Sequence, residues 1–513
     1  MKDTVTDSVS APMGETTDEA AGEATAHKAD ATPRRWLALP RGEDAARLTL
    51  VAAVVLLQNV LEISRTDLDA RIGRTATGLL FFAALTASLA LLLAALRTPL
   101  PRWRWPRWRW AQLLALVLVL AAVPIGVRQV GVAFSAGFRP PEYPNDGTTL
   151  DHYAAAQLLA GHNPYVTTDV VSAVRALGQD AEHTTPLGQG AFMDQYPLGY
   201  PDAQQLRRVF AGEPAGRPDA VPEFESHLSY PALSFLPLVP FVWAGLPSVV
   251  PFFALCFLAL AALLIVTVPG QLRLWLGLLI LADTPLLNST VAGDLDVFYI
   301  LLLFVAWRWW RRPILSAVFL GLAIAAKQLA WFFLPFYALL IWRERGWREA
   351  IARLAGAGGV FLLFNGPFIL GDAHAWLAGV LAPQVDRMFP LGNGIVQLSL
   401  SGLLPLAPSW LYSVLELAAV LASIGWYWKY GRAQPQYGIV LAVLPLFFAW
   451  RSLSTYFYFV VLPAVALLLA RGGHIVYSIR TEAGAGGTVP GGHSRRAALL
   501  SWRGSGARRR HER

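Results

Sequence analysis

Apolar residues occur in long runs along the chain, and short polar or basic segments separate them. A bilayer core about 30 Å thick is crossed by roughly 17–25 helical residues, so each run predicts a membrane-spanning helix, the shorter ones with the help of flanking residues. The predicted crossings are 48–62, 77–96, 110–127, 229–246, 249–268, 293–309, 314–328, 329–342, 351–370, 410–428, 437–450 and 454–470.

The polar segments orient these crossings. Basic residues collect on the cytoplasmic side of membrane proteins. Five arginines in 97–109 and four in 343–353 therefore predict cytoplasmic segments, whereas 128–228 has twelve acidic residues against six arginines and predicts an outer loop. The run 272–292 contains Asp283, Pro285 and Asn288, which are costly in contact with lipid, so we expect a re-entrant or broken helix on the outer side.

The pattern predicts an all-α integral membrane protein with about twelve crossings and one re-entrant segment. Both termini are expected in the cytoplasm. The predicted units are a disordered cytoplasmic tail (1–47), an N-terminal transmembrane helix pair (48–109), a transmembrane module (110–470) with its large outer loop, and a basic cytoplasmic tail (471–513).

Composition supports this class. Of 513 residues, 55% are hydrophobic and only 15% charged, where soluble proteins carry about 25% charged residues. The net charge of +8 is concentrated beside apolar runs and in the C-terminal tail, which favours a topology signal over a nucleic-acid partner. Cys256 is the single cysteine, so a disulfide framework and a cysteine metal site are excluded.

The start of the outer loop is the most informative segment. From Asn145 to Tyr165 the sequence predicts a short helix, with Thr148 or Thr149 as its cap and Gly161 after its end. This helix would present two carboxylates, Asp146 and Asp151, at the boundary between membrane and water.

The helix pattern Ala-Ala-x-x-Leu-Leu-x-Gly-x-Asn-Pro-Tyr, with an aspartate before it, resembles the first outer loop of C-type membrane glycosyltransferases. It is most similar to glycosyltransferase family 87, the polyprenyl-phosphate-mannose-dependent mannosyltransferases. Tyr230-Pro231, Gly293-Asp294 and Ala326-Lys327-Gln328 follow in the family's order, and the resemblance covers roughly residues 110–345. Asp146 matches the spacing of the family's aspartate better than Asp151 does.

The resemblance implies a C-type multi-pass helical bundle that moves a hexose, mannose in the first place, from a polyprenyl-phosphate donor to an envelope glycan or glycolipid. A carboxylate would act as general base, Asp146 or Asp151, with the other as a cap or ion-pair partner. Lys327 would stabilise the leaving phosphate, with a structural pairing to Asp294 or Asp296 as the alternative. Further substrate-binding candidates are Gln328, Asp294, Tyr230, Asn163, Tyr165, His374 and Arg387.

Several alternatives stay open at this point. Asn163 and Tyr165 could instead form a turn and pack against neighbours, and Tyr230 could anchor the helix at the membrane interface. His374 and Arg387 could be ordinary solvated loop residues. The histidines of the outer loop fit no zinc pattern. No cofactor is predicted, although some relatives in the superfamily use a divalent cation, which leaves Mg²⁺ or Mn²⁺ open.

The sequence also allows a different class, a secondary transporter or lipid flippase, in which Lys327 and Asp294 would form a coupling pair. No inverted repeat is visible, and the long outer loop is unusual for a carrier. We therefore expect an enzyme of the plasma membrane with its active site on the extracytoplasmic side and with membrane lipids, a lipid-linked donor and a glycan acceptor as its partners.

Overall fold

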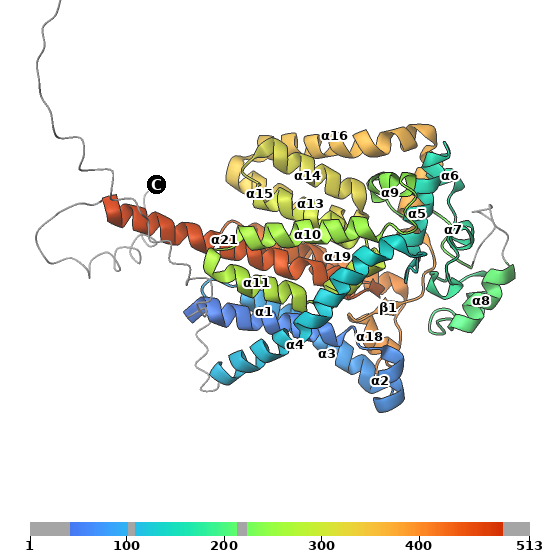
Figure 1. The fold of residues 1–513 in the computed structure, drawn as a ribbon, viewed down its shortest axis with the longest axis horizontal. Coiled ribbons are helices and arrows are strands. Elements are labelled where there is room, and N and C mark those ends of the chain that lie inside the picture. Colours follow the sequence, from blue (N-terminus) through green and yellow to red (C-terminus); the bar gives the residue numbers. More distant parts are fainter. Residues whose placement is uncertain (1–41, 101–107, 213–222, 486–513) are drawn as a thin grey trace, which may run out of the picture.

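The computed structural model describes residues 42–100, 108–212 and 223–485. They form a bundle of long helices with a cap of short helices at one end (Figure 1). The predicted fold class, an all-α membrane protein, is confirmed. The expectations for 1–41, 101–107 and 486–513 lie outside the described residues.

The long helices follow the predicted apolar runs. They are α1 (Gly42–Val60), α3 (Arg74–Ala95), α4 (Trp108–Ser135), α10 (Val250–Thr267), α11 (Gly270–Ala282), α13 (Asp296–Arg308), α14 (Pro313–Ala326), α15 (Leu334–Arg345), α16 (Trp347–Gly371), α19 (Ser409–Tyr430) and α21 (Thr455–Ala485). Two helices extend beyond the predicted boundaries of the membrane segments. Helix α1 begins within the predicted N-terminal tail, and α21 continues into the predicted C-terminal tail.

Among the described residues, five helices are long and apolar enough to cross a membrane alone, and up to seven spans result if each of two bent helix pairs counts as one. Shorter apolar helices cover 232–243, 313–326, 437–448 and 455–470. The predicted number of twelve crossings therefore stays a prediction. In α16 and α19 only 17% and 11% of the apolar window is buried, as expected for helices whose outer faces contact lipid.

The run 272–292 is not one straight helix, as its polar residues predicted. Helix α11 and helix α12 (Thr284–Ala292) meet at Asp283 with a bend of 57°. Asp283 caps α12, because its Oδ1 accepts a hydrogen bond from the Leu286 amide at 3.2 Å. Pro285 follows within the first turn, where a helix tolerates proline. A second bend, of 82°, separates α1 from α2 (Arg65–Ile72) and was not predicted.

The cap at one end of the bundle comes mainly from the predicted outer loop. It contains α5 (Asp146–Leu159), α6 (Pro164–Thr167), α7 (Val170–Leu177) and α8 (Ala203–Gly212), which lie together on the right of Figure 1. The turn between α15 and α16, which carries the predicted cytoplasmic arginines, lies at the opposite end (Figure 1). The predicted excursion 166–228 is thus partly helical in its described residues.

An extended layer lies beneath the cap. Strands β1 (Leu391–Gly392) and β2 (Arg451–Ser452) pair in parallel, with Leu391 opposite Arg451. Isolated bridges join Pro186 to Phe224 and Leu187 to Met388. Segments that are far apart in the sequence therefore meet at the capped end of the bundle.

Candidate active site

Helix α5 is fixed across the ends of the bundle helices by its first residues. Asn145 is the N-cap, and its Oδ1 accepts a hydrogen bond from the Thr148 amide at 2.7 Å. The expectation that Thr148 or Thr149 caps the helix is wrong, because the helix begins earlier, at Asp146. The Asn145 Nδ2 also donates to Asp294 Oδ1 at 2.9 Å, and Thr148 Oγ1 donates to the Gly293 carbonyl at 2.9 Å. Asp294 and the start of α5 are therefore in direct contact.

This docking depends on the small size of Gly293, which has a φ of +77°. A Cβ at this position would lie 2.6 Å from Thr148 Cγ2. We expect Gly293→Ala to destabilise the protein by about 1–3 kcal/mol more than Gly161→Ala, because overpacking adds to the cost of a left-handed backbone. Gly161 is a matched control, since its φ is +82° and a Cβ there would meet nothing within 4 Å. Melting temperatures of the two detergent-purified variants check this; equal losses would contradict the close docking.

Asp146 occupies the first turn of α5 and is partly exposed. Its Oδ2 accepts a hydrogen bond from the Thr185 amide at 2.6 Å. Enclosure by the cap raises the pKa of this carboxyl group, and the Thr185 amide and the positive charge of Arg451 lower it in part. A raised pKa makes this carboxyl group a stronger base, and its partial exposure leaves it within reach of a substrate.

Asp151 lies one turn further along and has a different environment. Its side chain is buried, and its Oδ1 accepts a hydrogen bond from Ser234 Oγ at 2.6 Å. Burial raises the pKa of Asp151 to about 7, although the Ser234 hydroxyl and the Lys327 charge act in the opposite direction. The two candidate carboxylates are thus distinct, one accessible and one packed beneath α5.

The raised pKa of Asp151 predicts a pH-dependent stability. The folded protein favours the protonated carboxyl group, so wild-type stability is lost as the pH rises from about 4, the ordinary aspartate value, to about 7. Asp151→Asn carries no charge and should not lose this contribution. The melting temperature of wild type relative to the variant should therefore fall between pH 4 and pH 7 and then level off. A difference that stays constant across this range would contradict the buried environment of Asp151.

Lys327 is paired with a carboxylate. It follows the end of α14, and its Nζ donates to Asp296 Oδ2 at 2.7 Å, with only 9% and 5% of the two side chains exposed. The Nζ also lies 5.4 Å from the centre of the Tyr230 ring. Of the two aspartates offered as structural partners of Lys327, Asp296 and not Asp294 forms the ion pair. Gln328 next to it donates through Nε2 to the carbonyls of Ser229 and, at 2.9 Å, of Val380.

The residues of the Asn-Pro-Tyr turn serve mainly to position the backbone. Asn163 caps α6 by accepting from the Tyr165 amide at 3.2 Å. Tyr165 is buried, and its hydroxyl donates to the Tyr230 carbonyl at 2.8 Å. This contact joins the turn to Tyr230, which is half-buried and lies in the electrostatic field of Asp146, Asp151, Glu225 and Asp296.

The side chains of two predicted binding residues have no contact with this cluster among the described residues. His374 is exposed on α17 (Ala373–Val385). The Arg387 side chain is also exposed, and its guanidinium lies 4.9 Å from the centre of the Tyr196 ring. Their positions fit the alternative of solvated loop residues better than contact with the carboxylates.

Two charged residues at the capped end, one buried and one half-buried, were missed from the sequence. Glu225 is buried, and burial together with the nearby Asp146 raises its pKa to about 8. Arg451 in β2 lies close enough to lower the pKa of both Asp146 and Glu225. A sequence signal existed for Arg451, because it is a lone cation between two apolar runs on the predicted outer side, where basic residues are uncommon.

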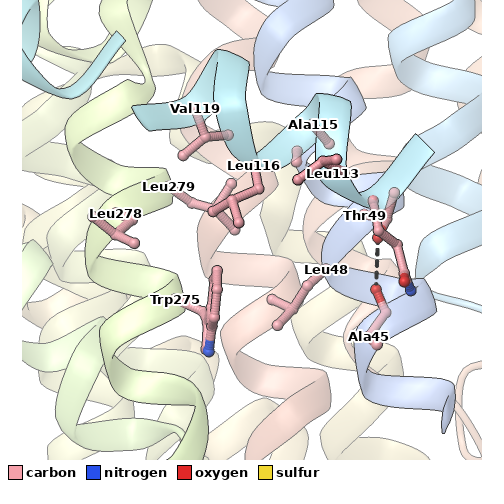
Figure 2. Close-up of a pocket in the computed structure, with 12 residues that line it drawn as sticks. Ala45, Leu48, Thr49, Leu113, Ala115, Leu116, Val119, Trp275, Leu278 and Leu279 are labelled. Carbon is pink, nitrogen blue, oxygen red and sulfur yellow. Dashed lines mark hydrogen bonds between the residues drawn. The ribbon is translucent and has the colours of Figure 1, made fainter. Parts of the chain in front are cut away.

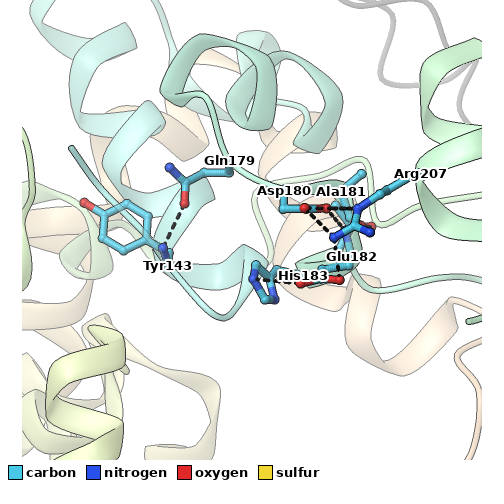
Figure 3. A network of polar contacts seen from close by, with 8 residues as sticks. Tyr143, Gln179, Asp180, Ala181, Glu182, His183 and Arg207 are labelled. Carbon is cyan, nitrogen blue, oxygen red and sulfur yellow. Dashed lines mark hydrogen bonds and ion pairs between the residues drawn. The ribbon is translucent and has the colours of Figure 1, made fainter. Parts of the chain in front are cut away.

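A surface network stabilises the outer part of the cap. Arg207 on α8 donates through Nε and Nη2 to Asp180 and through Nη2 to Glu182 at 2.8 Å (Figure 3). This bidentate contact lowers the pKa of Asp180 to about 2. The side chains are 34–52% exposed, so the network contributes little to stability. It joins α8 to the short helix at Ala181–His183.

A cavity of about 290 Å³ lies away from these polar residues, between α1, α4 and α11. Figure 2 shows that aliphatic side chains and Trp275 surround it. Its lining lacks the carboxyl groups described above, so the cavity suits a hydrocarbon chain and not the chemistry of a sugar. Within the described part of the chain, no group of three or more His, Cys, Asp or Glu residues is arranged to hold a metal ion.

Comparison with known families identifies the part of the chain that includes Tyr230, Asp294, Lys327 and Gln328. Residues 228–450 match the model of glycosyltransferase family 87. The match covers the middle of the chain and agrees with the family resemblance drawn from the sequence. The family indicates glycosyltransferase activity and a membrane enzyme, which the apolar helices support.

The family 87 match ends just before Arg451 and begins after α5. It extends further toward the C-terminus than the resemblance drawn from the sequence, which stopped near residue 345. No curated protein and no solved structure matches this chain. The roles of Asp146 and Asp151 therefore rest on the geometry of the capped end and not on the family match.

Proposed function

We propose that this glycosyltransferase moves a hexose, mannose in the first place, from a polyprenyl-phosphate donor to an envelope glycan or glycolipid with inversion at the anomeric carbon. The observation that carries the proposal is the position of Asp146, which is accessible at the capped end of an apolar helical bundle, beside Arg451 and the half-buried Tyr230. The proposed location is the plasma membrane, with the cap on the extracytoplasmic side and both termini in the cytoplasm.

A donor with an isoprenoid tail suits this architecture. The tail is hydrocarbon and stays in the bilayer, so its phosphate lies at the depth of the lipid headgroups. The apolar surfaces of the bundle helices face the tail, while the cap covers the end where the phosphate and sugar would lie. A donor in aqueous solution would have no need of a site at that depth.

The proposed reaction needs one base. Asp146 accepts the proton of the acceptor hydroxyl as its oxygen attacks the anomeric carbon. The bond between that carbon and the phosphate oxygen breaks, and its electron pair stays with the departing polyprenyl phosphate. Because phosphate is a good leaving group, no acid is required, and Asp151 beneath the helix serves the structure.

The proposal is tested by incubating membranes that contain the protein with labelled polyprenyl-phosphate-mannose or with a labelled nucleotide sugar. We expect label to enter the acceptor from the lipid-linked donor, also when synthesis of that donor from the nucleotide sugar is blocked. Transfer only from the nucleotide sugar would overturn the donor assignment. Solute movement without any transfer would favour the carrier class.

A further inference from the structure

Arg451 is a partly buried arginine that has a buried nitrogen without a partner at the capped end. Its Nη1 is buried and has no hydrogen-bond partner among the described residues. Arg47 and Arg353, by contrast, donate to a glutamate and to backbone carbonyls. Arg308 and Arg343 also have one unpartnered nitrogen each, but their guanidinium groups stack on Trp309 and Trp428.

The extended layer explains why Arg451 lies beside the carboxyl groups. Thr185, whose amide donates to Asp146, accepts from the Glu225 amide at 3.2 Å. Two residues further on, the Leu187 amide donates to the Glu223 carbonyl at 2.9 Å. One segment therefore connects the start of α5 with the strand-like segment around Glu225.

The same segment continues toward Arg451. The Gly188 amide donates to the Arg387 carbonyl at 2.7 Å, and the Trp450 indole donates to the Met388 carbonyl at 2.8 Å. The Leu391 amide then donates to the Trp450 carbonyl at 3.3 Å, where β1 meets β2. The backbone thus fixes Arg451 within the layer that holds Asp146 and Glu225.

An unpartnered acceptor accompanies this donor. Glu225 Oε1 is buried and has no hydrogen-bond partner among the described residues. A buried polar atom without a partner is costly, so such atoms often mark the place of a missing ligand. Arg451 Nη1 lacks an acceptor and Glu225 Oε1 lacks a donor, so a ligand that carries both an anionic oxygen and a hydroxyl group would satisfy the two atoms.

Lys327 is less suited to receive an anion. Its ammonium group already contacts Asp296 at 2.7 Å, and the carboxylate offsets its charge. Arg451 has no carboxylate within ion-pair distance among the described residues, so no ion pair offsets its charge. A planar guanidinium also matches two phosphate oxygens at once.

We propose that Arg451 binds the phosphate of the isoprenoid donor and stabilises the polyprenyl phosphate that leaves. This rests on the proposed function, because that reaction supplies the phosphate. When the bond from the anomeric carbon to the phosphate oxygen breaks, the electron pair remains on that oxygen and the phosphate gains negative charge. A fixed cation beside it stabilises the transition state more than the ground state.

The test compares two soluble probes that share an isoprenoid chain, farnesyl phosphate and farnesol, on the full chain in detergent. Wild type is expected to bind farnesyl phosphate at least about tenfold more tightly than farnesol, since charge-assisted hydrogen bonds contribute about 1.5–3 kcal/mol. Arg451→Gln should lose most of this preference, and Arg451→Lys should keep part of it. Arg207→Gln, on the surface of the cap, is the matched control and should keep it all.

A preference for the phosphate that persists in Arg451→Gln would overturn the inference, as would its absence in wild type. Melting temperatures of the variants separate loss of binding from loss of folding, and Arg451→Lys gives a second measure if the glutamine variant does not fold. The binding assay requires no sugar transfer. If wild type transfers the sugar and Arg451→Gln keeps its preference for farnesyl phosphate, only the inference about Arg451 fails. If this preference depends on Arg451 but no sugar is transferred, only the proposed function fails.

Discussion

Asp146→Asn is expected to reduce sugar transfer by about 10²–10⁴-fold, because it removes the proposed general base and leaves the side chain nearly isosteric. The asparagine Oδ1 can still accept the hydrogen bond from the Thr185 amide, so the start of α5 should keep its position. The loss should appear in kcat more than in KM for the donor. Initial rates with polyprenyl-phosphate-mannose and the purified protein check this.

Asp151→Asn is the matched control for this substitution. Both residues lie on α5, but Asp151 is buried against Ser234 and should affect mainly stability. Its transfer rate is expected to stay within about tenfold of wild type once unfolded protein is accounted for. If Asp146→Asn transfers at the wild-type rate, or if Asp151→Asn shows the larger catalytic loss, the assignment of the base fails.

Lys327→Ala is expected to destabilise the protein by about 3–5 kcal/mol, since it leaves the Asp296 carboxylate buried without its partner. The reason is the desolvation of Asp296 and not a loss of binding to substrate. The effect is measured by heating the detergent-purified protein and recording the fraction that still elutes as a single folded species.

The double variant Lys327→Met with Asp296→Leu distinguishes a structural pair from a binding cation. Because it removes both charges and retains apolar volume, it should recover most of the stability that the single substitution loses. If Lys327 instead bound the donor phosphate, the double variant would be stable but would lose its preference for farnesyl phosphate. A double variant as unstable as Lys327→Ala would contradict the structural account of the pair.

The membrane class and most helix positions could be predicted from the sequence, because an apolar run of sufficient length has few other structures available to it. Asp283, Pro285 and Asn288 likewise predicted the break between α11 and α12. Helix ends were less predictable. The cap at Asn145 depends on its contact with Asp294, which lies far away in the sequence.

The candidate site was predictable only where a local motif carried it. The aspartates of α5 and the Lys-Gln pair stood out as polar residues beside apolar runs. Arg451 has the same kind of signal, but its proximity to Glu225 and Asp146 could not be predicted, because the extended layer that joins them is built from short segments with no sequence period. Nor could the sequence decide which carboxylate pairs with Lys327, since Asp294 and Asp296 are only two residues apart.

The most direct test of the central claim is the stereochemistry and stoichiometry of one reaction, in which purified protein in liposomes receives a lipid-linked sugar of known anomeric configuration and its acceptor. A single displacement with Asp146 as base predicts one polyprenyl phosphate released for each glycosylated acceptor, and an inverted anomeric centre in the product. A product with retained configuration, or glycosylation without release of polyprenyl phosphate, would contradict it.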